Sequence, residues 1–186
     1  MLPGMLAGDP ALVHSVAHHC LDVAACALLL TSHFRSPVRV SPKTTAALIA
    51  LHDIGKFTRP FQAKAGEPLW PQALGAFRQP PSGPAHDQAG FALLSDEIEF
   101  LFSDWPGRSE RIPLLRAIAG HHGRPPAMRG ADELDRRVAC SVCVAAAGKF
   151  AQAVRDVIDP PSLPSLSERE IARLAWWLAG RPCHLG

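Results

Sequence analysis

Apolar side chains recur at intervals of three or four residues along much of this chain, and this spacing is the feature that most limits its fold. Near the N-terminus the recurrence forms one continuous series, made of Leu12, Val16, Cys20, Val23, Ala27 and Leu30. Side chains at this spacing lie on one face of an α-helix, which can be buried against a neighbouring helix. No segment shows a sustained alternation of apolar and polar residues, the pattern of a half-buried strand. The sequence therefore predicts an all-α fold.

The same spacing predicts further helices along the chain. A second helix over residues 44–54 is predicted to end at Gly55, because glycine commonly follows the last residue of a helix. Other helices are predicted over residues 91–101, 115–122 and 132–158. Ser167 and Glu170 have the spacing of a capping box, which predicts that a last amphipathic helix begins there. We expect these helices to pack as a compact bundle.

The segment 58–84 interrupts this pattern. It holds six prolines and three glycines and few apolar residues at helical spacing, which predicts a long loop after the second helix. Loops of this length in compact domains are usually functional or mobile.

Composition limits the class of protein. With 186 residues the chain is long enough for one domain with a substantial core, and we expect residues 1–186 to form a single domain. The formal net charge of +2 neither requires nor excludes a nucleic-acid partner, because binding depends on a local basic patch. No apolar run reaches the roughly 20 residues needed to cross a bilayer. A cytoplasmic protein without a membrane partner is expected.

The five cysteines lack the number and spacing of a disulfide framework. Cys140 and Cys143 form one C-x-x-C pair in an apolar helical stretch, but a zinc site would need two further ligands. We therefore expect free, buried thiols.

Histidines gather at the ends of predicted helices. These positions are His19, the pair His52-Asp53, His86 and the pair His121-His122. Imidazole nitrogens mixed with a carboxylate suit Mn, Fe, Co, Ni or Zn better than Ca or Mg alone. Adjacent residues of a helix point about 100° apart, so each pair would approach one site from different angles. The spacing alone leaves open a metal site and a set of ordinary histidines, and His14, His18, His33 and His184 have the ordinary interpretation.

The sequence Leu51-His52-Asp53-Ile54-Gly55-Lys56-Phe57 resembles the signature of the HD superfamily of metal-dependent phosphohydrolases. Its continuation through Phe61-Gln62-Ala63-Lys64 is similar to the HD nuclease domain of the type I CRISPR helicase–nuclease family. His19 followed by Asp22-Val23-Ala24 is similar to that family's first ligand motif. His86 and the stretch 119–123 resemble its later motifs in the expected order.

The resemblance implies a helical bundle that holds two divalent transition-metal ions, with Mn, Fe, Co or Ni favoured over Mg or Zn. His19, His52 and Asp53 would hold the first ion. The second ion would be held by Asp53, His86, His121 and His122, so that Asp53 would bridge the two ions. The implied reaction is hydrolysis of phosphodiester bonds in single-stranded DNA, with Asp53 and Lys56 as catalytic residues. The implied partners are a helicase domain or subunit and a CRISPR surveillance complex.

Aromatic and basic residues alternate through the predicted loop, as suits an unpaired strand whose bases stack on aromatic rings. Arg59, Lys64 and Trp70 are the candidates for DNA binding. Phe57 and Phe61 are interpreted instead as rings that cap the core of the bundle. Asp22 has two interpretations: it orients His19, or it is an ordinary surface residue.

The chain departs from the family pattern in one respect. The family's final ligand is an aspartate in an A-D-W-like motif, whereas this chain continues from Trp177 to Gly186 without one and resembles a truncated or divergent domain. Asp156 and Asp159 are the last aspartates, and the sequence leaves open whether either replaces that ligand. The ligand count predicts that the first metal is held less tightly. Two alternative functions remain: hydrolysis of small nucleotides by an HD phosphohydrolase, and a non-catalytic module that binds DNA or a partner protein.

Overall fold

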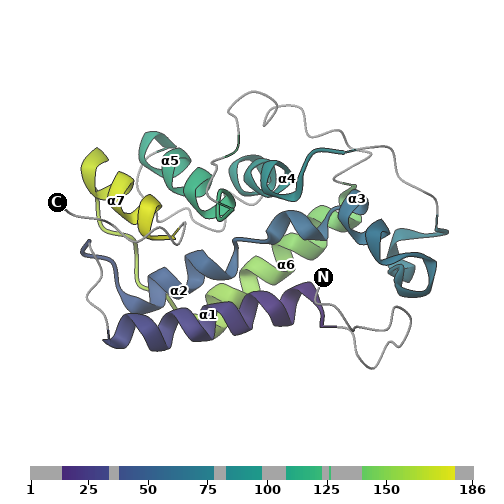
Figure 1. Cartoon of the computed structure of the whole chain (residues 1–186), viewed down its shortest axis with the longest axis horizontal. Helices are drawn as coiled ribbons and strands as arrows, with labels where there is room; N and C mark the ends of the chain where they lie inside the picture. The colour runs from purple at the N-terminus through teal and green to yellow at the C-terminus, as the bar shows by residue number, and fades with distance from the viewer. Residues whose placement is uncertain are drawn as a thin grey trace.

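The computed structural model describes residues 14–33, 38–77, 83–97, 108–122, 126 and 140–178. Every regular element in these ranges is helical, which confirms the all-α prediction. Helix α1 (Val16–His33) packs along α2 (Pro42–Ala50), and α2 also contacts α6 (Ser141–Ile158). On the other side of the molecule, α4 (His86–Ala92), α5 (Arg108–Ala119) and α7 (Glu168–Leu178) follow one another (Figure 1).

The core lies between these two groups of helices and is mainly aliphatic. Its largest fully buried side chains come from α2 and the turns after it, from α4 and the turn after it, and from α5, α6 and α7. They are Leu48, Leu51, Ile54, Phe91, Leu93, Leu94, Leu114, Leu115, Ile118, Val154 and Leu174. Burial of such side chains stabilises the fold by about 1.5–3 kcal/mol each relative to leaving them exposed. The face of α1 predicted from its spacing is only partly covered, because Cys20 and Ala27 are buried while Leu30 is 55% exposed.

The second helix ends earlier than predicted. Ser41 caps its start, since the hydroxyl oxygen accepts a hydrogen bond from Thr44 N at 3.0 Å. The helix ends at Ala50 with Leu51 as its cap residue, and after two further residues a short helical turn, η2 (Ile54–Phe57), begins. His52 and Asp53 therefore lie in a turn between two elements, and the expected 100° divergence along one helix does not apply to them.

The bounds of three other helices differ from the predictions. Helix α4 begins earlier than predicted, at His86, ends at Ala92 and continues as a wider turn, η6 (Leu93–Glu97). Residues 98–101 of the predicted helix lie outside the described residues. Helix α5 begins at Arg108 and ends at Ala119, so His121 and His122 follow the helix. Helix α6 begins at Ser141 because Cys140 has an extended backbone, with ψ at 159°, and it runs unbroken through Gly148. Residues 132–139 of the predicted helix lie outside the described residues.

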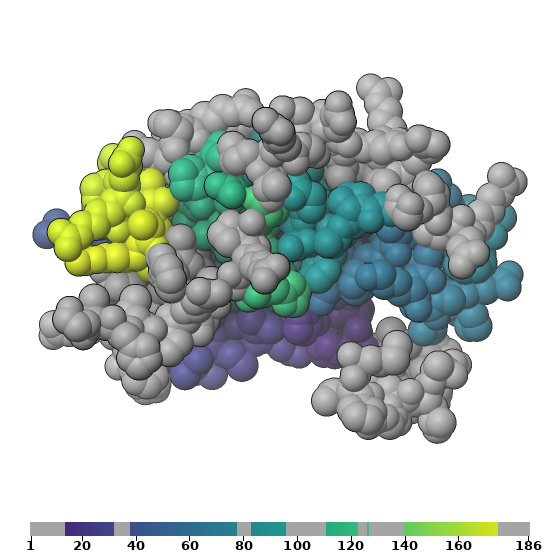
Figure 2. All heavy atoms as spheres, turned by 45° about the horizontal axis from the view of Figure 1, so that its top comes forward, coloured from purple at the N-terminus to yellow at the C-terminus, as the bar shows by residue number. Residues whose placement is uncertain are grey.

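The described part of the predicted loop, up to Phe77, contains short helical turns. These are α3 (Arg59–Gln62), η3 (Ala63–Ala65), η4 (Glu67–Leu69) and η5 (Gln72–Leu74). Gly66 lies between η3 and η4, and Gly75 follows η5, at φ values of 80° and 77°, which favour glycine. We call residues 57–77 the motif-flanking segment. It lies beyond α4, at the end of the molecule away from α7 (Figures 1 and 2).

The predicted capping box at the start of α7 is confirmed. The Glu170 carboxylate accepts a hydrogen bond from Ser167 N at 3.0 Å, and Ser167 Oγ accepts one from Glu170 N at 3.4 Å. Among the helices described, none has the length and apolar character that a membrane span requires.

Candidate metal centre

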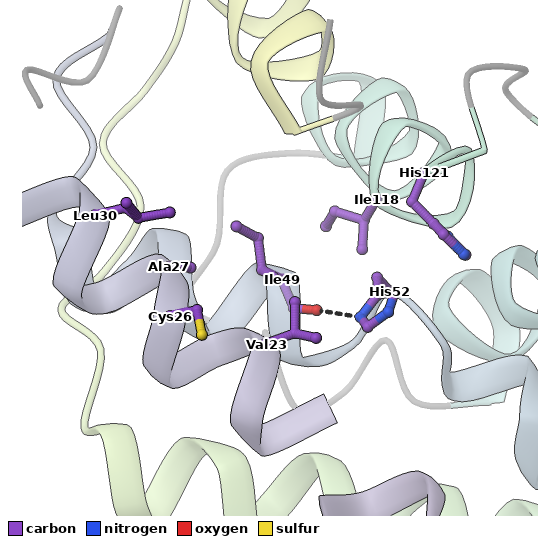
Figure 3. A pocket seen from close by; sticks show the side chains of 8 residues that line it. All are labelled: Val23, Cys26, Ala27, Leu30, Ile49, His52, Ile118 and His121. Atoms are coloured by element: carbon purple, nitrogen blue, oxygen red, sulfur yellow. Dashed lines mark hydrogen bonds between the residues drawn. The ribbon is translucent and has the colours of Figure 1, made fainter. Parts of the chain in front are cut away.

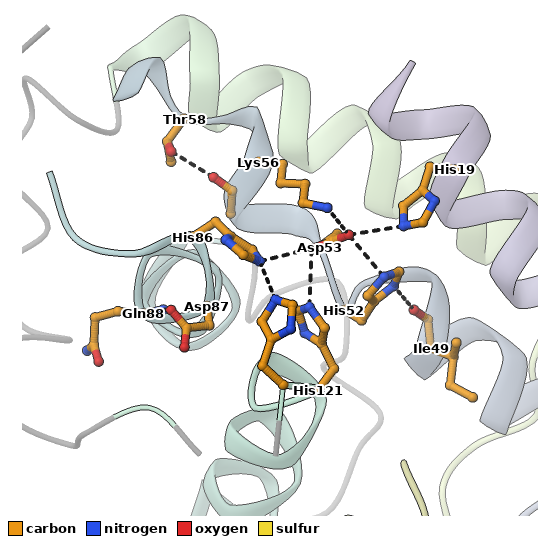
Figure 4. Close-up of polar contacts among 12 residues, drawn as sticks. His19, Ile49, His52, Asp53, Lys56, Thr58, His86, Asp87, Gln88 and His121 are labelled. Carbon is orange, nitrogen blue, oxygen red and sulfur yellow. Dashed lines mark hydrogen bonds and ion pairs between the residues drawn. The ribbon is translucent and has the colours of Figure 1, made fainter. Parts of the chain in front are cut away.

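The buried carboxylate of Asp53 is the centre of a cluster of imidazoles. Its side chain is 2% exposed, and it lies in the turn between α2 and η2. Figure 4 shows His19, His52, His86 and His121 pointing toward it from separate elements. The structure thus brings together residues that are up to 102 positions apart in the sequence, in the order that the motifs predicted.

One carboxylate oxygen of Asp53 faces α1 and α2. Asp53 Oδ2 lies 3.1 Å from His19 Nε2 and 3.1 Å from His52 Nε2. Lys56 Nζ donates to the same oxygen at 2.5 Å. The ligand atoms of His19, His52 and Asp53 lie within 4.8 Å of one another, so these three residues could hold one ion.

The other oxygen faces α4 and the turn after α5. Asp53 Oδ1 lies 3.3 Å from His86 Nε2 and 3.4 Å from His121 Nε2. His122 Nε2 is 3.0 Å from His86 Nε2, and the ligand atoms of His86, His121 and His122 lie within 4.8 Å of one another. Each oxygen of a single carboxylate therefore faces its own set of imidazoles.

Several of these side chains lie at or near the ends of helices, so each helix approaches the carboxylate with one end. His86 is the first residue of α4, and its position depends on a close contact between two backbones. A Cβ added at Gly55 would lie 1.8 Å from the carbonyl oxygen of His86 and 2.5 Å from Gly90 N. Only glycine fits there, so Gly55 of the motif allows η2 to pack on the first turn of α4.

The orientation of His52 is set by a backbone carbonyl. His52 Nδ1 lies 2.8 Å from the oxygen of Ile49, and because a carbonyl only accepts, Nδ1 must carry the proton. In the neutral ring, Nε2 then presents its lone pair to Asp53 Oδ2. A cation bound between these two atoms, which are 3.1 Å apart, would satisfy both of them. A backbone carbonyl that orients a histidine in this way is common behind metal ligands.

Burial controls the charges in the cluster. Burial alone would raise the pKa of the Asp53 carboxyl, but contacts with His52, His86 and Lys56 hold it far below its ordinary value, so the group is ionised. Burial lowers the pKa of His121 from 6.5 to about 4 and outweighs the opposing effect of Asp53. Burial also lowers the pKa of His19. At neutral pH, His19 and His121 are therefore uncharged and able to bind a metal.

The donor set fits divalent cations. Among the described residues, the buried atoms Asp53 Oδ1 and His121 Nδ1 make no hydrogen bond. Buried polar atoms without partners are rare in folded proteins, and a cation would satisfy the carboxylate oxygen. Nitrogen-rich sets with one carboxylate suit transition metals. Within the described ranges, only two groups of three or more side chains have this ligand spacing: His19 with His52 and Asp53, and His86 with His121 and His122. The Cys140–Cys143 pair is not among them.

The predicted DNA-binding residues have different surroundings. Lys64 is exposed. Arg59 is half-buried and donates from Nη2 to the carbonyl oxygen of Leu74 at 3.1 Å. Trp70 disagrees with the prediction, because it is 9% exposed and its indole N–H donates to Gly75 O at 2.8 Å. Its ring is therefore enclosed within the motif-flanking segment and offers no open face to a base.

The two phenylalanines of the motif also differ from each other. Phe57 packs on Phe150, with ring centroids 5.4 Å apart, and borders the core as predicted. Phe61 is only half-buried and is not packed against the core cluster, so its predicted capping role is wrong. Its ring meets His86 edge-on, with centroids 5.6 Å apart. The sequence feature that could have predicted a position for Phe61 near the site is its place between two lysines, Lys56 and Lys64.

The remaining acidic candidates lie away from the cluster. Asp22 is exposed and contacts His14 Nε2 at 3.1 Å, which favours the surface interpretation. Asp159 is 91% exposed and lies 3.8 Å from Lys43 Nζ, near the start of α2, whereas Asp53 follows the end of that helix. Asp156 is exposed and accepts a hydrogen bond from Gln152. Neither Asp156 nor Asp159 replaces the family's final ligand in this structure.

An apolar pocket of about 290 Å³ reaches the cluster from the side of α1. Val23, Cys26 and Leu30 of α1 face Ile49 and Ile118 across it, and His52 and His121 lie at one end (Figure 3). Apolar side chains beside the imidazoles lower the local dielectric, which strengthens the electrostatic interactions of the centre.

Comparisons with known proteins agree with this geometry. A family model described as "Cas3, HD domain" matches residues 6–181. The CRISPR-associated endonuclease/helicase Cas3 of Escherichia coli (strain K12) is 30% identical in an alignment that covers 60% of this chain but 16% of that protein. A solved structure described as "Crystal structure of CRISPR-associated protein" superimposes with a TM-score of 0.71 at 22% identity, covering 90% of this chain and 20% of that one. Since the family model matches nearly the whole chain, the protein belongs to the Cas3 HD-domain family.

Proposed function

We propose that this chain is a metal-dependent nuclease domain that hydrolyses phosphodiester bonds of single-stranded DNA in type I CRISPR interference. One observation carries the proposal: the two oxygens of the buried Asp53 face two separate sets of ligands. A carboxylate in this position can bridge two cations. Two-metal sites of this kind are typical of enzymes that cleave phosphodiesters.

The proposed ligands follow from the two sets. His19, His52 and Asp53 hold the first ion, and Asp53, His86, His121 and His122 hold the second. Both are divalent transition-metal ions, with Mn, Fe, Co or Ni favoured and Mg or Zn as alternatives. When bound, such a pair activates water and stabilises negative charge on the attacking and leaving oxygens.

The chain's own residues have distinct tasks in this reaction. Asp53 stays ionised and holds the ligand sets together, and Ile49 O keeps the His52 lone pair directed inward. Lys56 lies beside Asp53 with its ammonium group also 5.4 Å from the Phe61 ring. From there it can donate to a phosphate oxygen of the substrate and offset the charge that develops during cleavage. Lys64, which is exposed, is placed to contact a neighbouring phosphate.

The proposed partners are single-stranded DNA, a helicase domain or subunit, and a CRISPR surveillance complex. The description of the Escherichia coli relative as an endonuclease/helicase supports this proposal, and the family match covers the part that corresponds to this chain. We also propose that residues 1–186 act as one nuclease domain.

The test is a cleavage assay with the purified chain. Labelled single-stranded DNA, the matching duplex and free nucleotides are incubated with Mn²⁺, Ni²⁺, Co²⁺ or Mg²⁺, with and without a chelator. We expect the single strand to be cut fastest, and cleavage to stop when the metal is chelated.

Asp53→Ala should lower the cleavage rate by at least about a hundred-fold, because the substitution removes a ligand from both ions. Asp156→Ala is the matched control, since it removes an exposed carboxylate that belongs to neither ligand group, and this variant should cut at the wild-type rate. Hydrolysis of nucleotides without action on DNA would point to a small-molecule phosphohydrolase. Binding of DNA without any cleavage would point to a non-catalytic module.

A further inference from the structure

A second and larger cavity lies beside the metal centre. It has a volume of about 590 Å³, within the range of about 300–1,000 Å³ common for small-molecule sites. The motif-flanking segment forms one wall, and the starts of α1 and α6 form the other. Its described lining is largely apolar and includes Phe57, Phe61, Leu69, Leu74 and Val142.

Cations border this apolar cavity at the side of Phe61. Lys64 Nζ lies 5.1 Å from the centre of the Phe61 ring, and Lys56 Nζ lies 5.4 Å from it. Both ammonium groups are attracted by the electron-rich face of the ring. Lys64 also lines the cavity and is exposed, so it is free to move toward a phosphate.

The same ring connects the cavity with the metal centre. Phe61 contacts His86 edge-on, and His86 Nε2 lies 3.3 Å from Asp53 Oδ1. A group that stacks on Phe61 is therefore only one side chain away from the proposed cleavage site. An aromatic platform flanked by cations is the arrangement that binds unpaired bases together with their phosphates.

We propose that this cavity binds one unpaired nucleobase of the substrate strand, stacked on Phe61, while Lys64 contacts the adjacent phosphate. The proposal rests on the proposed nuclease function and names the feature of the substrate that the site reads. Stacking is open to every base because each has a flat face, so the pocket is tolerant of sequence. A base within a duplex has no free face, so the pocket also accounts for a preference for single strands.

The experiment is a cycle that changes the ring and the base together. Binding of a fluorescent oligo-thymidine is compared with binding of the same backbone carrying abasic tetrahydrofuran residues, in EDTA so that no strand is cut. We expect Phe61→Leu to weaken binding of oligo-thymidine on the order of ten-fold. The same variant should bind the abasic strand as the wild type does. Phe61→Trp, which keeps an aromatic ring, should bind oligo-thymidine as tightly as the wild type.

Phe77→Leu is the matched control, since it makes the same change in the same segment. The Phe77 ring packs on Trp70, with centroids 5.4 Å apart, and does not line the cavity. The Phe77→Leu variant should bind both strands as the wild type does. An equal loss for both strands in Phe61→Leu would show a structural role for the ring and overturn the proposal. So would a wild-type protein that binds the two strands equally well.

Cleavage with Mn²⁺ separates this proposal from the proposed function. If the coupling between ring and base is present but the wild type never cuts the thymidine strand, the nuclease proposal fails and the base pocket stands. If the wild type cuts both strands at the same rate and the coupling is absent, the nuclease proposal stands and the base pocket fails.

Discussion

Individual side chains in the centre are held in the protonation state that a metal requires. His52 is fixed as one tautomer by Ile49 O, and burial keeps His121 neutral. Asp53 remains charged although it is buried, because His52, His86 and Lys56 surround it. Each of these effects is local, so each can be tested by changing one residue.

His121 should make the metal-free protein sensitive to acid. Its pKa is about 4 in the fold and ordinarily 6.5, so between these values the unfolded chain binds the proton and the folded chain does not. Stability is thus complete above pH 6.5 and falls as the pH approaches 4. We expect the free energy of unfolding, measured with urea, to decrease by about 2 kcal/mol between pH 7.5 and pH 5.

His121→Gln provides the comparison, because glutamine does not titrate. Over the same pH range, the free energy of unfolding of this variant should decrease by much less than that of the wild type. A decrease as large as in the wild type would mean that other groups cause the acid sensitivity.

Replacing Lys56 should slow cleavage without weakening metal binding. Its ammonium lies 2.5 Å from Asp53 Oδ2, where it competes with a cation in the first ligand set. In Lys56→Met we expect kcat on single-stranded DNA to fall on the order of a hundred-fold, while the affinity for Mn²⁺ stays the same or increases. Lys56→Arg keeps the charge and should lose less activity. A Met variant that cuts at the wild-type rate would remove Lys56 from the mechanism.

At the scale of elements, the early end of α2 is what assembles the centre. Because the helix ends at Ala50, the turn that follows can direct both His52 and Asp53 inward. The chain then continues as η2, which packs against α4 through Gly55. The spacing between η2 and α4 therefore sets the distance between Asp53 and His86.

Gly55→Ala should separate these two elements. The added methyl group would meet the His86 carbonyl, so α4 must shift or the fold must lose about 1–3 kcal/mol. We expect weaker binding of the second metal in calorimetry, together with a lower midpoint of thermal unfolding. Gly75→Ala is the control: its φ of 77° disfavours alanine, but no atom lies within 4 Å of the added Cβ. It should lose some stability and keep its metal affinity.

At the scale of the whole molecule, two candidate ligand sets from four separate segments share one carboxylate. The described residues offer four groups to the second ion and three to the first, and Lys56 lies beside the first. We therefore expect Mn²⁺ to bind in two calorimetric steps, with the second site occupied at the lower concentration. His19→Ala should remove only the weaker step. Loss of the tighter step in that variant would reverse the assignment.

Much of this organisation was predictable from local patterns. The spacing of apolar residues predicted an all-α bundle, since helical periodicity depends only on neighbours along the chain. Ser167 and Glu170 predicted the start of α7 for the same reason. The motif around His52 and Asp53 predicted the centre of the cluster, because it combines metal-ligand chemistry with the glycine that a close backbone contact requires.

Other features were decided only by tertiary packing. The motif-flanking segment has no regular apolar period, so the sequence did not reveal that Trp70 is enclosed while Phe61 faces a cavity. Likewise, Asp159 was a plausible ligand until the arrangement of α6 beside α2 placed it at the far end of that helix. The sequence by itself determined that the chain is helical and which imidazole and carboxylate side chains are able to bind a metal ion. The tertiary structure decided which of those side chains meet, because contacts between distant segments depend on how whole helices pack.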